Sequence, residues 1–252
     1  MDGVVTDLFV TAPAQARHAG LVAAAADAGV AVQVISGEAM SELAQTVTPQ
    51  GLLAVCGFID VPLADITRAR PRLVVLLANV RDPGNAGTVL RAADAAGADA
   101  VIFGDASVDP YNGKCVRASA GSLFHLPVAA LSSGAALSSG AAQSSGATQP
   151  EQGIRLPGAI AELRAAGLRV IAADGRSGLT LDDPAARELL AEPTAWLFGN
   201  EAWGLPDELL ALADASVAVP IYGRAESLNL ATAAAVCLYA SASARHPRVA
   251  GA

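Results

Sequence analysis

The stretch from residue 195 to residue 239, AWLFGNEAWGLPDELLALADASVAVPIYGRAESLNLATAAAVCLY, decides the fold. It runs twice through one pattern, in which an apolar strand is followed by a polar loop containing glycine and then by a helix. The predicted strands are Ala195–Phe198 and Ser216–Ile221, and the predicted helices run from Pro206 to Ala213 and from Ser227 to Ala244. Because α/β sheets bind ligands where their strands end, both loops are candidate binding loops.

The two loops carry polar side chains that a packed core would not need, namely Asn200, Glu201, Ser227 and Asn229. A purely structural interpretation is available for each of them. Ser227 would cap the last helix, while Asn200 and Glu201 would be solvated turn residues. The loops alone leave both interpretations open.

Composition indicates a globular protein with a sizeable core. The chain has 252 residues, of which 53% are hydrophobic and 16% are charged, so one or two domains are expected. No apolar run is long enough to span a bilayer, and the N-terminus has no basic leader, which predicts a cytoplasmic protein. Its 3 Cys and 3 His are scattered, so neither a disulfide framework nor a metal site is expected.

The charge balance argues against general nucleic-acid binding. The formal net charge is −8, from 24 acidic and 16 basic residues, and Lys114 is the one lysine among the basic residues. A local patch of arginines remains compatible with this balance. The positions of individual arginines therefore matter more than their number.

Two domains are predicted, 1–68 and 70–252, with a boundary near residues 69–72 where proline and charge interrupt the apolar pattern. The first is a small α/β unit. The second contains residues 131–153, LSSGAALSSGAAQSSGATQPEQG, whose Gly/Ser/Ala repeats predict a flexible insertion without function.

The second domain begins with another strand, loop and helix. Residues 73–78, LVVLLA, form a continuous apolar run that is typical of a strand buried on both faces of a parallel sheet. A polar loop follows at 79–87, and then a predicted helix at 88–96. The loop matches neither GxGxxG nor the P-loop pattern. Its candidate residues are Asn85 and, on the helix, Arg91, for which a solvated or helix-paired arginine is the structural alternative.

Three segments together resemble the signature motifs of the SpoU/TrmH class of SPOUT RNA methyltransferases. They are NVRDPGNAGTVLRAADAAG (79–97), LFGNEAWGLP (197–206) and VPIYGRAESLNLATAAA (219–235). The segment VRASAGSLFHLPV (116–128) also resembles the family. The resemblance spans residues 72–245 apart from the insertion, and the order and separation of the motifs make it specific.

The resemblance implies an α/β fold, in which a SPOUT trefoil-knotted parallel-sheet domain follows a small L30e-like RNA-binding domain. It also implies S-adenosylmethionine as cofactor, a homodimer, and methyl transfer to a ribose 2′-hydroxyl of rRNA or tRNA. The first unit departs from the family, because the usual leading segment with its basic helix is missing before Val4. A truncated start and weaker RNA binding are therefore expected, in keeping with the charge of −4 over residues 1–70.

The resemblance assigns roles to individual residues. Arg91 would act on the RNA by binding a phosphate and favouring the alkoxide, since an arginine is a poor base. Arg117 would be a further phosphate contact. The positions matching the family's active site are Asn85, Arg91, Glu201, Ser227 and Asn229, with Glu201 expected to orient an arginine. The positions expected to hold the cofactor are Gly199, Val219, Ile221 and Leu228.

Two other functions are weighed against the 2′-O-methyltransferase. A SPOUT-like protein that binds RNA without catalysis would not need the complete polar set. A nucleotide-cofactor oxidoreductase would be expected to carry GxGxxG. Calorimetry with S-adenosylmethionine and with NAD would separate the methyltransferase from the oxidoreductase.

Overall fold

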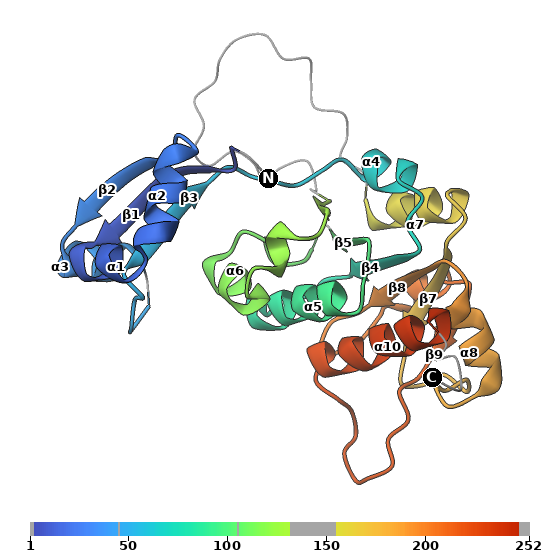
Figure 1. Cartoon of the computed structure of the whole chain (residues 1–252). Helices are drawn as coiled ribbons and strands as arrows, with labels where there is room; N and C mark the ends of the chain where they lie inside the picture. The colour runs from blue at the N-terminus through green and yellow to red at the C-terminus, as the bar shows by residue number, and fades with distance from the viewer. Residues whose placement is uncertain (1–2, 45, 105, 132–154, 247–252) are drawn as a thin grey trace, which may run out of the picture. The chain divides into compact units, whose positions relative to one another are not determined.

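The computed structural model describes residues 3–44, 46–104, 106–131 and 155–246. The chain divides into two compact units, Met1–Ile59 and Asp60–Ala252 (Figure 1). All of the predicted insertion except Leu131 lies outside the described residues. None of the helices within the described ranges is long and apolar enough to cross a membrane.

The first unit is a small α/β unit with a three-stranded sheet in the order β2-β1-β3. β1 pairs parallel with β2 and antiparallel with β3. Leu8 and Val10 of β1 are buried against Ala14 and Val22 of the helices. The elements are β1 (Val5–Thr11), α1 (Ala12–Arg17), α2 (Ala19–Asp27), β2 (Ala31–Ile35), α3 (Gly37–Leu43) and β3 (Leu52–Cys56).

The second unit is built on a six-stranded sheet whose order is β6-β5-β4-β8-β7-β9 and whose pairings are all parallel. Its strands are β4 (Leu73–Leu77), β5 (Ala100–Phe103), β6 (Val128–Ala130), β7 (Arg169–Ala173), β8 (Thr194–Phe198) and β9 (Ala215–Val217). Its helices are α4 (Leu63–Arg68), α5 (Pro83–Ala95), α6 (Gly113–Ser119), the 3₁₀ turn η1 (Ser122–Phe124), α7 (Leu156–Ala165), α8 (Pro184–Ala191), α9 (Asp207–Leu210) and α10 (Leu230–Arg245).

Helices cover both faces of this sheet, which explains why all five residues of β4 are buried. On one face, Val74 and Leu76 pack in a core that includes Leu163 of α7. On the other face, α10 packs against α5 and α8, and Figure 1 shows α5 and α10 running side by side. The predicted parallel α/β fold is confirmed, whereas the trefoil threading stays a prediction.

The division between the units lies about ten residues before the predicted boundary at 69–72. Residues 60–69 belong to the second unit, because Leu63 and Ile66 of α4 are buried in its core. Proline and charge near residue 70 mark the end of α4 and the start of β4 rather than a domain boundary.

Two predicted helix starts are wrong for related reasons. α5 begins at Pro83 instead of residue 88, since the Asp82 side chain accepts a hydrogen bond from the Asn85 backbone N–H and caps the helix. The Asp-Pro pair was the available signal, as Asp favours the N-cap and Pro the first helical position. α10 begins after Asn229 instead of at Ser227, and Asn229 is its cap.

The predicted strand 216–221 is cut short to β9, which ends at Val217. The next residue, Ala218, still donates its N–H to the Leu179 carbonyl. Pro220 has no N–H to continue a ladder, so the chain leaves the sheet edge before reaching it. The predicted helix 206–213 is likewise reduced to the four residues of α9.

One buried hydrogen bond fixes α10 against the sheet. The Trp196 indole Nε1 donates to Ser241 Oγ over 2.8 Å, and both residues are fully buried. We expect Ser241→Ala to lower the free energy of unfolding by about 1–3 kcal/mol, because it leaves a buried indole N–H without an acceptor. Urea denaturation measures this change. Ser243→Ala, at an exposed position of the same helix, is the matched control and should change stability little.

Candidate active site

Two neighbouring strands send the chain in opposite directions at the carboxyl edge of the sheet. β4 pairs with β8, yet β4 continues to β5 on one side, whereas β8 continues to β9 beyond β7 on the other. Parallel α/β sheets bind ligands outside the carboxyl ends of the strands at such a switch point. The loops after β4 and β8 therefore mark the candidate site.

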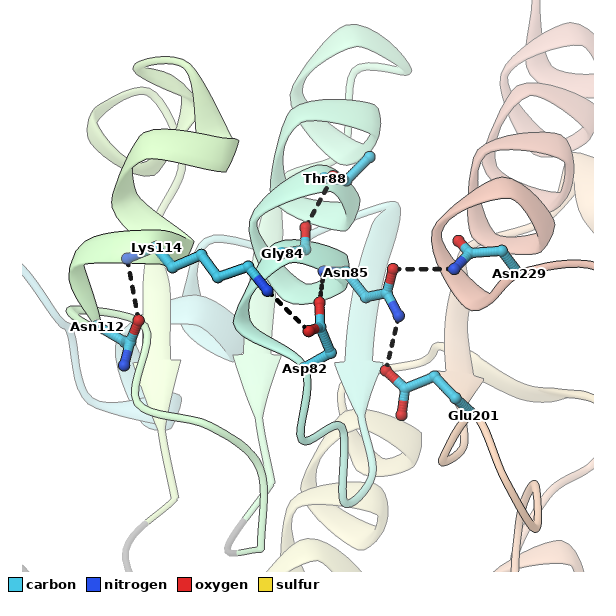
Figure 2. Close-up of polar contacts among 8 residues, drawn as sticks. All are labelled: Asp82, Gly84, Asn85, Thr88, Asn112, Lys114, Glu201 and Asn229. Carbon is cyan, nitrogen blue, oxygen red and sulfur yellow. Dashed lines mark hydrogen bonds and ion pairs between the residues drawn. The ribbon is translucent and has the colours of Figure 1, made fainter. Parts of the chain in front are cut away.

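Three of the residues predicted for the active site meet there in a chain of hydrogen bonds. Asn85 Nδ2 donates to Glu201 Oε1 over 3.0 Å, and Asn229 Nδ2 donates to Asn85 Oδ1 over 3.0 Å. Figure 2 shows Asn85 on α5 between Glu201 and Asn229, which come from segments 116 and 144 residues further along the chain. The fold thus joins one residue from each motif.

The cap at the start of α10 decides which atoms donate and which accept in this chain of hydrogen bonds. Asn229 Oδ1 accepts hydrogen bonds from the backbone N–H groups of Ala231 at 2.9 Å and Thr232 at 3.4 Å. The amide oxygen is therefore engaged, and only the Nδ2 donor of Asn229 remains for Asn85. Asn85 must in turn present its oxygen to Asn229 and its donor to the Glu201 carboxylate.

Asn229→Asp should retain the helix cap and break the chain, because aspartate caps helices well but cannot donate as asparagine does. Whichever way Asn85 then turns its amide, one acceptor faces another acceptor. We expect the activity of this site to fall roughly 5- to 150-fold, the equivalent of about 1–3 kcal/mol. Initial rates and thermal unfolding should be compared with those of Asn229→Ala, which also loses the cap and about 1 kcal/mol of stability. If Asn229→Asp kept wild-type activity, the hydrogen bonds that join Glu201, Asn85 and Asn229 would not be needed for activity.

Asn200 holds the two loops together instead of remaining a solvated turn residue. It is 6% exposed, and its Nδ2 donates to the Asn79 carbonyl over 2.8 Å. Its Oδ1 accepts from the Ala202 N–H, and its backbone forms two hydrogen bonds with Gly204. Sequence reasoning singled out Asn200 but missed Asn79, whose left-handed backbone (φ 59°) turns the chain out of β4.

Asp82 organises the first loop from below Asn85 (Figure 2). One carboxylate oxygen accepts from the Asn85 N–H, and the other pairs with Lys114 Nζ at 3.0 Å. The Lys114 ammonium, and next the Asn85 N–H, lower the pKa of Asp82. The cap therefore stays ionised at neutral pH. Its contribution to stability is lost only as the pH falls through the lowered pKa.

The residues expected to hold the cofactor lie in the segments that follow β8 and β9. Gly199 is buried at the end of β8. Val219, Ile221 and Leu228 lie on the segment between β9 and α10, which Figure 1 shows as a long loop projecting from the sheet. Ile221 and Leu228 expose 39% and 37% of their surface. Ser227, in the same loop, is exposed and forms no hydrogen bond with a described residue.

Arg91 does not join this hydrogen-bonded chain. It follows Asn85 by six positions on α5, which places it about 240° further around the helix and about 9 Å along it. Arg91 and Arg117 are exposed and form no ion pair with any described residue. Within the described residues Glu201 contacts Asn85 rather than an arginine, so its expected role in orienting an arginine is not fulfilled within one chain.

The chain is similar to one family of known proteins. The SpoU rRNA Methylase family model matches residues 72–148 and 135–239. The 23S rRNA (guanosine(2553)-2'-O)-methyltransferase RlmP of Bacillus subtilis is 36% identical over 84% of this chain and 73% of its own length. The 23S rRNA (uridine(2479)-2'-O)-methyltransferase of Streptomyces viridochromogenes is 32% identical over 73% of this chain, which spans only 58% of that enzyme.

Solved structures agree with this likeness. An AdoMet-bound rRNA methyltransferase from Sinorhizobium meliloti superposes with a TM-score of 0.71 at 30% identity, covering 94% of this chain and 79% of that one. AviRb, a SpoU methyltransferase from Streptomyces viridochromogenes in complex with AdoMet, gives 0.74 at 26% identity, covering 99% and 86%. Sequence motifs, parallel sheet and matched residues lead to one conclusion: the chain belongs to the SpoU rRNA methylase family.

Proposed function

We propose that the protein transfers a methyl group from S-adenosylmethionine to a ribose 2′-hydroxyl of rRNA or tRNA, with 23S rRNA as the first candidate. The observation that carries this proposal is the Glu201–Asn85–Asn229 chain at the switch point between β4 and β8. A family member that only binds RNA would have no need of three motifs converging in this way. The names of the two relatives quoted above, both 23S rRNA 2'-O-methyltransferases, support the choice of reaction.

The residues present fit the cofactor. Ile221 and Leu228 offer exposed apolar surface that suits a purine ring, and the Glu201 carboxylate offers a negative charge that suits a cationic sulfonium. When bound, S-adenosylmethionine supplies a methyl group activated by its sulfonium. Gly199, Val219, Ile221 and Leu228 would hold its adenosine part.

The remaining work falls to the protein's own side chains. Asn85, fixed between Glu201 and Asn229, would keep the loops after β4 and β8 at a constant separation around the reacting groups. Arg91 and Arg117 would bind phosphates of the RNA, and the Arg91 guanidinium would stabilise negative charge as the 2′-hydroxyl loses its proton. Ser227 would donate a hydrogen bond to substrate or cofactor.

The test is incubation of the purified protein with methyl-labelled S-adenosylmethionine and with rRNA or tRNA from a strain that lacks the gene. Label should enter RNA, and the modified nucleotide should resist alkaline hydrolysis, because a 2′-O-methyl blocks attack by that oxygen. Label on a base would contradict the proposed position. RNA binding without label would favour the non-catalytic alternative.

We also propose a homodimer. α10 carries no charged residue before Arg245, and Val236 and Tyr239, three positions apart on one side of the helix, expose 40% and 55% of their surface. An exposed apolar helix face of this kind suits a second copy. We expect light scattering at micromolar concentration to give twice the chain mass. A monomer would contradict the assembly.

We propose that the first unit is an L30e-like domain. It would contact RNA, and the protein would act in the cytoplasm. The unit's order of alternating strands and helices around a three-stranded sheet supports this assignment. It carries only one of the 16 basic residues, Arg17, which indicates that affinity for RNA resides mainly in the second unit.

A further inference from the structure

An exposed tryptophan lies beside the candidate active site without a role in the hydrogen-bonded chain. Trp203 exposes 55% of its surface, whereas Trp196 is fully buried. The loop that carries Trp203 is already closed by the backbone pair between Asn200 and Gly204, with both N–O distances at 2.9 Å. The indole is therefore not needed to close the loop.

A cation is held against this indole. Arg81 Cζ lies 5.3 Å from the centroid of the Trp203 ring, which is within the range of a cation–π contact. Arg81 Nε also donates to Asn79 Oδ1 over 3.0 Å. The guanidinium is thus held from two sides, while its two terminal nitrogens have no partner among the described residues.

The charge of Arg81 is available, unlike that of the nearby lysine. Lys114 is paired with Asp82, but no described carboxylate lies within ion-pair distance of Arg81. Trp203 follows Glu201 by two positions and Arg81 precedes Asn85 by four, so the pair belongs to the same two loops as the hydrogen-bonded chain. An exposed indole suits stacking on a nucleic-acid base, and an unpaired guanidinium beside it suits the phosphate of the same nucleotide.

We propose that Trp203 and Arg81 form a binding surface for a nucleotide of the substrate RNA beside the methylated ribose, a proposal that rests on the proposed function. The indole stacks on the base, and the terminal nitrogens of Arg81 donate to its phosphate. Single-stranded RNA is commonly recognised by stacking on aromatic rings and guanidinium planes. The surface takes any base, because every base has a π face.

The first experiment uses tryptophan emission and needs no turnover. A single-stranded oligoribonucleotide is added to the full-length protein, alongside an abasic oligomer of the same length and charge. The base-containing oligomer should quench the emission of Trp203, and the abasic oligomer should not. Trp203→Phe leaves only buried Trp196 and should lose the response. Equal quenching by both oligomers would overturn the proposal. Quenching by S-adenosylmethionine but by neither oligomer would also overturn it.

The second experiment uses kinetics. Trp203→Ala should raise KM for RNA roughly 5- to 150-fold, which is the value of one stacked base, with the change in KM rather than in kcat. Trp203→Phe keeps a ring and should recover most of the affinity. Arg81→Ala should raise KM and make it less dependent on salt, since one phosphate contact is lost.

These outcomes separate stacking from other roles of Trp203. Weaker binding of S-adenosylmethionine by Trp203→Ala would assign the ring to the cofactor, and dissociation into monomers would assign it to the subunit interface. Either result overturns the proposal. If wild type methylates RNA while Trp203→Ala keeps its KM, stacking fails and the proposed function stands. If wild type methylates no RNA, the proposed function fails, and the quenching experiment still decides whether Trp203 binds a base.

Discussion

Arg91→Ala is expected to lower RNA methylation roughly 10²- to 10³-fold and to leave the affinity for S-adenosylmethionine nearly unchanged. A guanidinium that meets negative charge as it develops acts mainly in the transition state, so its loss lowers turnover without weakening ground-state cofactor binding. Folding should not suffer, because Arg91 is exposed and has no ion-pair partner among the described residues. Single-turnover methylation and calorimetry with the cofactor measure the two effects.

The control for Arg91 is another exposed arginine on a helix of the same unit. Arg187 on α8 is exposed and, within the described ranges, forms no ion pair, so Arg187→Ala removes an equal charge away from the site. It should retain methylation. A similar loss in both variants would assign the effect to overall charge. Loss of cofactor affinity in Arg91→Ala would place the residue at the cofactor instead of the RNA.

The geometry of α5 extends this prediction to the proposed dimer. Arg91 lies about 240° around α5 from Asn85, so it points away from its own subunit's hydrogen-bonded chain. If Arg91 of one subunit serves the site of the other, a mixed dimer of Arg91→Ala with a cofactor-binding variant contains one intact site. Random mixing should then restore about a quarter of wild-type activity, since half the dimers are mixed and each has one site. No recovery despite proven subunit exchange would rule out the shared site.

The sequence indicated which residues would gather at one edge of the sheet, but not how they would contact one another. Asn85, Glu201 and Asn229 follow strand-like segments in three separate motifs, so their arrival at one edge of a parallel sheet could be expected. Their mutual hydrogen bonds could not, because these depend on β8 pairing with β4 across an intervening chain of more than a hundred residues. Strand order of this kind is set by the whole core, and local periodicity does not reveal it.

Local preferences were overridden where tertiary contacts competed with them. No helix was predicted within residues 60–69, yet Leu63–Arg68 form α4 because the core buries Leu63 and Ile66. A structural role for Ser227 as the cap of α10 was one interpretation left open, but Asn229 caps the helix with its oxygen and still donates to Asn85. An asparagine offers both functions in one side chain, and serine with its single hydroxyl does so less well.

Gly199→Ala is expected to abolish cofactor binding and methylation, for a reason that differs from the one the sequence suggested. The resemblance implied that Gly199 holds the cofactor, where a glycine would let the backbone approach the ligand closely. In the structure, a Cβ at Gly199 would lie 2.4 Å and 2.5 Å from the C and O atoms of Gly204, and 2.7 Å from the Leu205 nitrogen. These are backbone atoms of the protein's own loop, and they cannot yield as the end of a flexible side chain would.

A single methyl group at residue 199 should therefore force the loop open at the Asn200–Gly204 pair and carry Glu201 away from Asn85. Overpacking of this kind costs about 1–3 kcal/mol, so the sheet should remain folded while the site is lost. Calorimetry with S-adenosylmethionine and thermal unfolding test both halves of the prediction. Gly204→Ala is the matched control in the same loop: its Cβ meets nothing within 4 Å, and only its positive φ of 71° is unfavourable. It should keep measurable cofactor binding. If instead Gly199→Ala bound the cofactor like wild type, the loop's close approach to its own backbone would not be what requires glycine at this position.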